Sequence, residues 1–217
     1  CSSDLEAIDK YDNIYVPQGW YRITETLKMK PDTKLIGLHP FGTQFRLDES
    51  TAAFSGFGGP KAMVESSEGG ANMLMGIGIN TGGYNYRAVG VKWMANADSY
   101  MNDVKFVGGH GGLWKPKPGV EEPRGRWNRP ARISSPDNPV AASGMDLAWD
   151  NQYWSLWVTN NGGGTFKDIW TASTYATNGF YANNTSTPGR IYAMSIEHHV
   201  RNEVRFSKVS NWKVYCM

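Results

Sequence analysis

Short runs of apolar, β-branched and aromatic residues recur along this chain of 217 residues, separated by turns rich in glycine, proline and asparagine. Each run has the length of one sheet strand, and none continues for several helical turns. Residues 4–11, in which Leu5 and Ile8 are three apart, predict a short helix before the first strand. We expect strands near residues 14–16, 34–38, 62–65, 73–79, 89–94, 103–107, 153–158, 165–170, 179–182, 191–196, 203–206 and 212–215.

The spacing of these runs predicts coils of a solenoid. The first two lie about twenty residues apart, with Pro17-Gln18-Gly19 and Pro31-Asp32-Thr33 as turns between them. A turn, a strand and another turn recur in 101–109, 164–173 and 203–215, as expected where each coil adds one strand to a parallel sheet. A β-sandwich favours short Asp-Gly and Asn-Gly hairpins, and this chain has no Asp-Gly. We therefore predict an all-β fold, a right-handed parallel β-helix, as a single domain over residues 1–217.

One segment, residues 115–140, interrupts this pattern. It carries six prolines and four arginines and has no strand-like run of useful length. Two interpretations stay open: an irregular excursion packed by its own Trp127, or a binding loop on a rigid scaffold. Because strand-like runs resume after it, we predict an insertion within the domain and not a domain boundary.

Charge and composition narrow the classes of partner. The formal net charge is +2, from 22 basic and 20 acidic residues, so we expect neither nucleic acid nor an anionic membrane surface as partner. No apolar run is long enough to span a membrane, and residues 1–20 lack the pattern of a signal peptide. The two cysteines, Cys1 and Cys216, would lie far apart in a stacked solenoid, which argues against an internal disulfide. Cys1 is either a lipid-modified residue or the site of a cut.

Two histidine-containing stretches could carry chemistry. In Glu197-His198-His199, strand alternation would place Glu197 and His199 on one face and His198 on the other. A carboxylate beside histidines can serve as a general acid or base, and the same group can be purely structural. His110 lies between glycine pairs, where backbone can approach a ligand or simply turn. No spacing typical of a metal or nucleotide site occurs, so we predict neither metal nor cofactor.

Aromatic residues are dense in 148–158, AWDNQYWSLWV. Strict alternation would send Tyr153 and Trp157 to one face of a strand and Trp154 to the other. Exposed tryptophans stack on the apolar faces of sugar rings, whereas inward ones belong to the core, and both interpretations stay open.

Longer strings carry a resemblance to a known family. IYVPQGWYRITETLKMKPDTKLIGLHP resembles the opening coils of the pectate-lyase-like β-helix superfamily. RAVGVKWMANADSYMNDVKFVGG, NNGGGTFKDIW and YAMSIEHHVRNEVRFSKVSNWKVY resemble the β-helical region of glycoside hydrolase family 55, the exo-β-1,3-glucanases. The likeness runs through most of residues 5–217. It implies inverting hydrolysis, in which the catalytic groups stand about 6.5–9.5 Å apart to admit a water.

The resemblance also implies roles for individual residues. Glu197 would lie in the active-site cleft as a catalytic residue. In that family a general acid follows in a Gln-Thr-Glu motif, which would fall beyond Met217, so we expect a larger protein with further polypeptide packing at the C-terminal end. Asn96 stands where the family has a water-holding glutamine, and Gly163 replaces a serine. Substrate contacts would come from Asn96, His110, Trp154, Asn161 and His198.

The function predicted from the sequence is that of a secreted or cell-surface carbohydrate-active protein, a glycoside hydrolase acting on a β-glucan or similar polysaccharide. The alternative is a polysaccharide-binding or adhesion β-helix without catalysis. A calcium-dependent polysaccharide lyase would need a cluster of aspartates along the sheet, which is not visible in the sequence.

Overall fold

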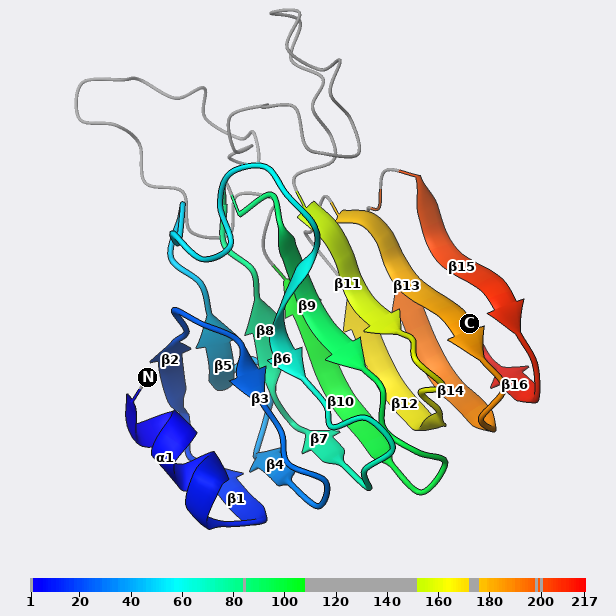
Figure 1. Cartoon of the computed structure of the whole chain (residues 1–217), viewed down its shortest axis with the longest axis horizontal. Helices are drawn as coiled ribbons and strands as arrows, with labels where there is room; N and C mark the ends of the chain where they lie inside the picture. Colours follow the sequence, from blue (N-terminus) through cyan, green and yellow to red (C-terminus); the bar gives the residue numbers. More distant parts are fainter. Residues whose placement is uncertain (1, 84, 108–151, 172–175, 198, 200) are drawn as a thin grey trace, which may run out of the picture.

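The fold of the chain is described by a computed structural model that covers residues 2–83, 85–107, 152–171, 176–197, 199 and 201–217. Within these ranges the protein is all-β apart from one short helix, α1 (Ser2–Lys10), which confirms the predicted class. The strands form two sheets that face each other as two layers (Figure 1). None of the helices in these ranges has the length and apolar character needed to span a bilayer.

The two sheets are named sheet A and sheet B. Along its main path sheet A has the order β1 (Asn13–Val16), β4 (Lys34–Gly37), β7 (Met73–Met75), β10 (Tyr100–Val107), β12 (Gly164–Thr171), β14 (Gly189–Ile196) and β16 (Trp212–Tyr215). Beside it β2 (Gly19–Arg22), β5 (Thr43–Arg46) and β8 (Gly78–Asn80) pair with one another, and β8 pairs with β10. Sheet B has the order β15 (Asn202–Val209), β13 (Ala176–Thr185), β11 (Gln152–Val158), β9 (Ala88–Trp93), β6 (Lys61–Glu65) and β3 (Leu27–Lys28).

Every strand pair is parallel, and the chain visits sheet A and then sheet B in each circuit. Parallel neighbours cannot be joined by a tight hairpin, and here the strand of the opposite sheet provides the crossover. Residues of successive circuits therefore stack in register, as in the column Leu156, Phe180 and Val204 on sheet B. This arrangement is compatible with a β-helix-like fold.

All twelve predicted strand positions are confirmed, and the differences are local. The run 73–79 forms two strands, β7 and β8, because Gly76 between them has a positive φ of 64°. Three short strands, β2, β3 and β5, were not predicted. Their sequences mix charged and polar residues with the apolar ones, and only pairing with adjacent circuits makes them strands.

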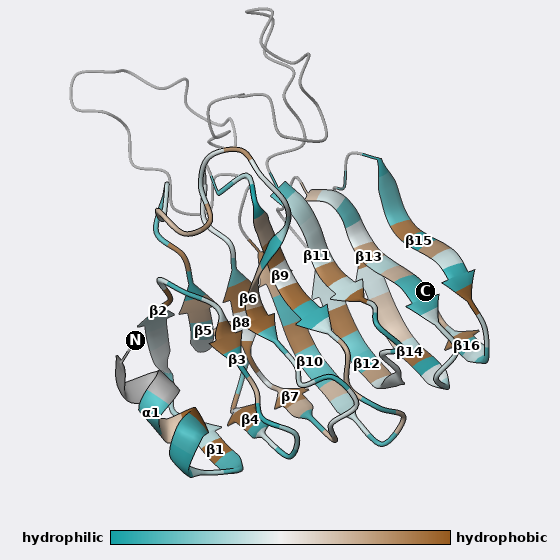
Figure 2. Ribbon diagram, viewed as in Figure 1, coloured by the Kyte–Doolittle hydropathy of each residue, from teal (hydrophilic) through white to brown (hydrophobic). Residues whose placement is uncertain are grey.

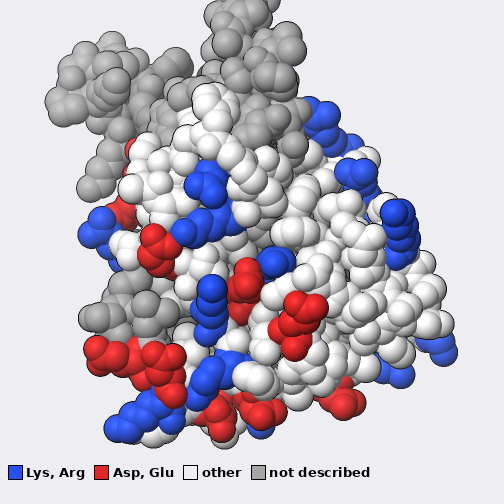
Figure 3. Space-filling view, in the orientation of Figure 1, with Lys and Arg blue, Asp and Glu red and all other residues white. Residues whose placement is uncertain are grey.

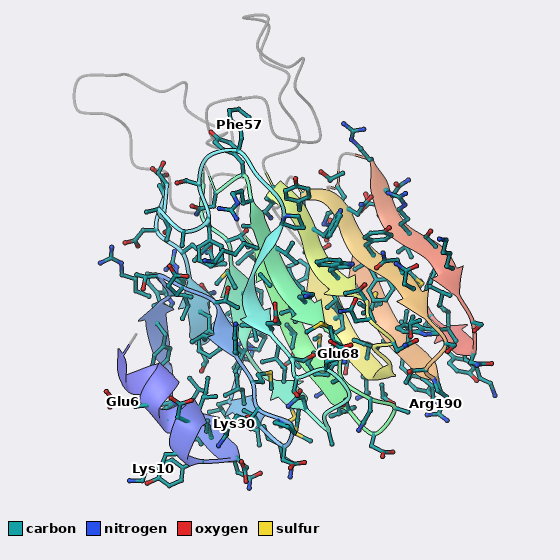
Figure 4. The ribbon with its side chains drawn as sticks, in the orientation of Figure 1. Glu6, Lys10, Lys30, Phe57, Glu68 and Arg190 are labelled. Carbon is teal, nitrogen blue, oxygen red and sulfur yellow. The ribbon has the colours of Figure 1, made fainter. Side chains whose placement is uncertain are left out.

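The core lies between the sheets and is built from columns of stacked side chains. Trp93, Phe106, Phe166 and Phe180 are fully or almost fully buried, and Phe166 contacts Trp93 and Phe180 with ring centroids 6.0 and 6.1 Å apart. Apolar positions alternate with polar ones along the ribbons, and side chains fill the space between the layers (Figures 2 and 4). Ile8 of α1 joins the same core, so the helix covers its first circuit.

A column of left-handed residues runs across sheet A. Gly76, Asp103, Asp168, Ala193 and Cys216 occupy equivalent positions in successive circuits, and their φ angles are 64°, 49°, 51°, 53° and 55°. Glycine adopts this conformation freely, aspartate tolerates it, and alanine does so at a cost. The extended conformation is therefore interrupted at the same place in each of these circuits.

Candidate functional site

Glu197 lies directly after β14, at the corner where the chain leaves sheet A for sheet B. Its carboxylate Oε1 accepts a hydrogen bond from Trp170 Nε1 of the neighbouring strand β12 at 2.7 Å. Its backbone N–H donates to Thr171 Oγ1 at 3.0 Å, which fixes the turn. The side chain is therefore half-buried and held in one orientation.

The indole of Trp170 is flanked on the outer face of sheet A. The ring of Phe41, from the loop between β4 and β5, meets it edge-on with centroids 5.8 Å apart. Lys105 Nζ lies 5.6 Å from the centroid of the same ring. Glu197 thus borders a small outer surface made of two aromatic rings and an ammonium group.

His199 does not share a face with Glu197. Its side chain has no exposed surface, and its Nδ1 lies 2.7 Å from Glu203 Oε2 while Nε2 lies 3.2 Å from Ser155 Oγ. The prediction from strand alternation is wrong here because β14 ends at Ile196. His199 ties the corner to β11 and is a structural residue in this arrangement.

Asn96 and Asn161 lie at the opposite corner, where the chain returns from sheet B to sheet A. Asn96 Nδ2 donates to Gly69 O at 3.0 Å and its Oδ1 accepts from Asp98 N at 2.9 Å, so the amide closes a turn. Asn161 has a φ of 59° and its Oδ1 accepts from Ser186 N at 3.4 Å. The eight residues of β12 separate the two corners by about 26 Å, so the structure does not bring these amides to Glu197.

Trp154 lies on the outer face of sheet B within an aromatic cluster. Its ring centroid is 4.7 Å from that of Trp157, 5.0 Å from that of Tyr181 and 5.4 Å from that of Tyr153. The predicted separation of Trp154 and Trp157 onto opposite faces is wrong. Ser155 and Leu156 between them are both buried, which breaks the alternation in β11 and leaves both tryptophans outside.

A groove of about 450 Å³ opens beside this cluster, and Trp157 forms one of its walls. Lys92 Nζ lies 5.4 Å from the centroid of that indole. Figure 3 shows basic and acidic side chains gathered over the end of this face where β3, β6 and β9 lie. The groove is lined by Glu25, Thr26, Lys28, Pro60, Lys61, Ala62, Glu65, Lys92 and Trp157.

The charges of the groove are largely paired. Glu25 accepts a hydrogen bond from Lys61 Nζ at 2.6 Å, and Glu65 Oε2 lies 3.7 Å from Lys92 Nζ. The groove therefore offers two anionic acceptors, several cationic donors and one aromatic wall.

Three predicted features lie outside the described residues. They are His110, His198 and the segment 115–140. Among the described residues no group of three or more histidine, cysteine or acidic side chains is placed to hold a metal ion.

Sequence reasoning missed the groove and the partners of Glu197. Nothing in the sequence around Trp170 indicated a functional role. Trp170 becomes the partner of Glu197 because β12 and β14 are neighbouring strands, which brings the indole next to the carboxylate. Glu25, Glu65 and Lys92 come from three different circuits. The sequence signal for the groove would have been a charged residue that recurs at the same strand position in successive circuits, as Glu65 and Lys92 do.

No protein-family model and no curated protein matches this chain in sequence. The resemblance to glycoside hydrolase family 55 therefore stays a prediction.

Proposed function

We propose that the chain forms a parallel β-helix that binds a polysaccharide on the outer face of sheet B. The observation that carries this proposal is the groove in which Trp157 stands opposite charged and hydroxyl-bearing side chains. Sugar rings have apolar faces and polar edges, so a site for them combines an aromatic wall with a few placed polar groups.

The register of sheet B supports an elongated ligand. Lys92 pairs with Trp157, which pairs with Tyr181 and then with Arg205, and in the other direction Lys92 pairs with Glu65 and Lys28. Neighbouring strands lie about 4.8 Å apart, so this row of six side chains extends over about 24 Å. Tyr181 is buried against Trp154 and Arg205, so a polysaccharide chain that crosses the strands would meet the other five side chains of the row in turn.

Binding is favoured over hydrolysis in the groove by the contacts of its carboxylates. An inverting hydrolase needs two carboxyl groups that face the scissile bond and a water. Glu25 is engaged by Lys61 at 2.6 Å and Glu65 by Lys92 at 3.7 Å, so both carboxylates are already used in ion pairs.

Hydrolysis at Glu197 is the second candidate. The observation that favours it is the 2.7 Å hydrogen bond from Trp170, which orients the carboxylate on a surface that also carries Phe41. If Glu197 catalyses hydrolysis of a β-glucan, Glu197→Gln abolishes release of reducing sugar and leaves retention on the glycan unchanged. Equal turnover by the wild type and the variant would contradict this role.

The binding proposal is tested by affinity electrophoresis through gels that contain laminarin, cellulose derivatives or xylan. Trp157→Ala is expected to weaken retention about tenfold, as loss of a central aromatic contact does. Tyr192→Ala is the matched control, because Tyr192 is an exposed aromatic that stacks on Tyr215 on sheet A. A wild-type protein that no glycan retains, or equal loss in both variants, would contradict the proposal. Polysaccharides of this kind lie outside cells, so we also propose an extracellular or cell-surface location.

A further inference from the structure

Arg46 carries a buried guanidinium on strand β5 of sheet A, outside the set of residues that line the groove. Only 8% of the residue is exposed. Its Cζ lies 4.0 Å from the ring centroid of Trp20, and Trp20 itself is 69% exposed. The indole therefore covers the guanidinium with one face and presents surface to the solvent.

The Nε–H donor of Arg46 is fully buried and has no hydrogen-bond partner in the part of the chain that the structure describes. The carboxylate of Asp48, which interacts electrostatically with Arg46, is bound to Arg22, whose Nε lies 2.6 Å from Asp48 Oδ2. Burial lowers the pKa of Arg46, and the charge of Asp48 partly opposes that effect.

A purely structural role leaves this arrangement unexplained. Stacking on Trp20 compensates part of the charge, but it does not satisfy the buried Nε–H, which lies in the plane of the guanidinium. Buried guanidinium groups are normally paired with a carboxylate or a phosphate, since an unpaired buried charge is strongly destabilising. Arg205 shows the contrast: it stacks over Tyr181 at 4.8 Å and is exposed to water.

The neighbours of Arg46 in the sheet also present donors. Arg22 on β2 and Asn80 on β8 are its register partners, so all three side chains project from the same face. Asn80 Oδ1 accepts from Gly82 N at 3.0 Å, and its amide nitrogen makes no hydrogen bond to another described residue. Two guanidinium groups and one amide thus converge beside an exposed indole.

We propose that Arg46, with Arg22, Asn80 and Trp20, binds the acid group of an acidic sugar, a carboxylate or a sulfate ester. The guanidinium fork donates two parallel hydrogen bonds to the oxygens of such an acid group, and the sugar ring stacks on the open face of Trp20. This inference rests on the proposed glycan binding and adds a second site on sheet A with a charged ligand class.

The test uses the whole chain and follows the side-chain Nε–H signals of its arginines by NMR. Glucuronate, inorganic sulfate and glucose are titrated separately, and the Arg46 signal is assigned with Arg46→Lys. Glucuronate or sulfate is expected to shift the Arg46 signal at concentrations at which glucose does not. Arg46→Gln is expected to weaken binding of the acid about tenfold, because it loses both charge and fork.

Arg190→Gln is the control, because Arg190 is an exposed arginine of β14 that belongs to neither proposed site, and it is expected to leave binding unchanged. Equal shifts of Arg46 and Arg190 would reduce the effect to non-specific ion pairing and overturn the proposal, as would an Arg46 signal that neither acid moves. If Arg46→Gln fails to fold, the wild-type titration and Arg46→Lys still decide. The two proposals can fail separately. If acids shift the Arg46 signal but Trp157→Ala binds neutral glycans as well as the wild type does, the groove is refuted and the Arg46 site is supported.

Discussion

Trp170 Nε1 donates a hydrogen bond to Glu197 Oε1 at 2.7 Å, and this bond links β12 to the corner that follows β14. The two residues are 27 positions apart in sequence and one strand apart in the sheet. Removal of the Glu197 carboxylate leaves the indole N–H without its acceptor. Substitutions at the two residues can therefore measure how much this hydrogen bond contributes to stability.

Glu197→Ala is expected to lower the free energy of unfolding by about 1 kcal/mol, because it leaves the half-buried indole N–H without an acceptor. Glu197→Gln keeps a side-chain oxygen and is expected to cost less. Urea unfolding measures both, and Trp170→Phe completes a double-mutant cycle. Additive losses in that cycle would mean that the hydrogen bond contributes nothing to stability.

Ala193 is the one alanine in the left-handed column of sheet A, with a φ of 53°. This conformation costs an alanine about 1–2 kcal/mol, whereas glycine adopts it without strain. Glycine also gains freedom in the unfolded chain, which offsets part of the benefit. Ala193→Gly is therefore expected to raise the free energy of unfolding by about 0.5 kcal/mol.

The control for this prediction is Ala182→Gly in β13, where φ is not positive and the methyl group is fully buried. It is expected to destabilise the protein by about 1 kcal/mol. Thermal unfolding followed by circular dichroism compares the two variants. A Tm that falls in both would show that the left-handed position carries no strain.

Gly78 is expected to be intolerant of a side chain. A Cβ at this position would overlap the backbone carbonyl oxygen of Pro40, in the loop that carries Phe41 onto Trp170. Gly78→Ala would displace that loop at a cost of about 1–3 kcal/mol. It would also increase the exposure of Trp170, which acrylamide quenching of fluorescence measures.

Gly59→Ala provides the matched substitution, since a Cβ there would have no atom within 4 Å. Its stability and quenching are expected to equal those of the wild type. If Gly78→Ala behaves in the same way, the loop yields without cost and the prediction is wrong.

The candidate site could be foreseen only in part. The sequence singled out Glu197 and Trp154, and the structure gives each an aromatic partner, Trp170 and Trp157. Strand alternation failed at β11 because Ser155 and Leu156 are both buried. Asn96 was grouped with Glu197, yet its amide is used in a turn at the far corner of the sheet.

The sequence by itself determined much of the local structure of this protein: short strands and turns, an all-β class, and those left-handed positions that glycine, aspartate and asparagine fill. These features depend on residues that are close together in the sequence, because each residue type has its own preferred backbone conformations. The tertiary structure alone decided which outward side chains stand in one row, such as Glu65, Lys92 and Trp157. That alignment depends on the register between circuits of unequal length, which periodicity does not specify, and on it rest both proposed binding sites.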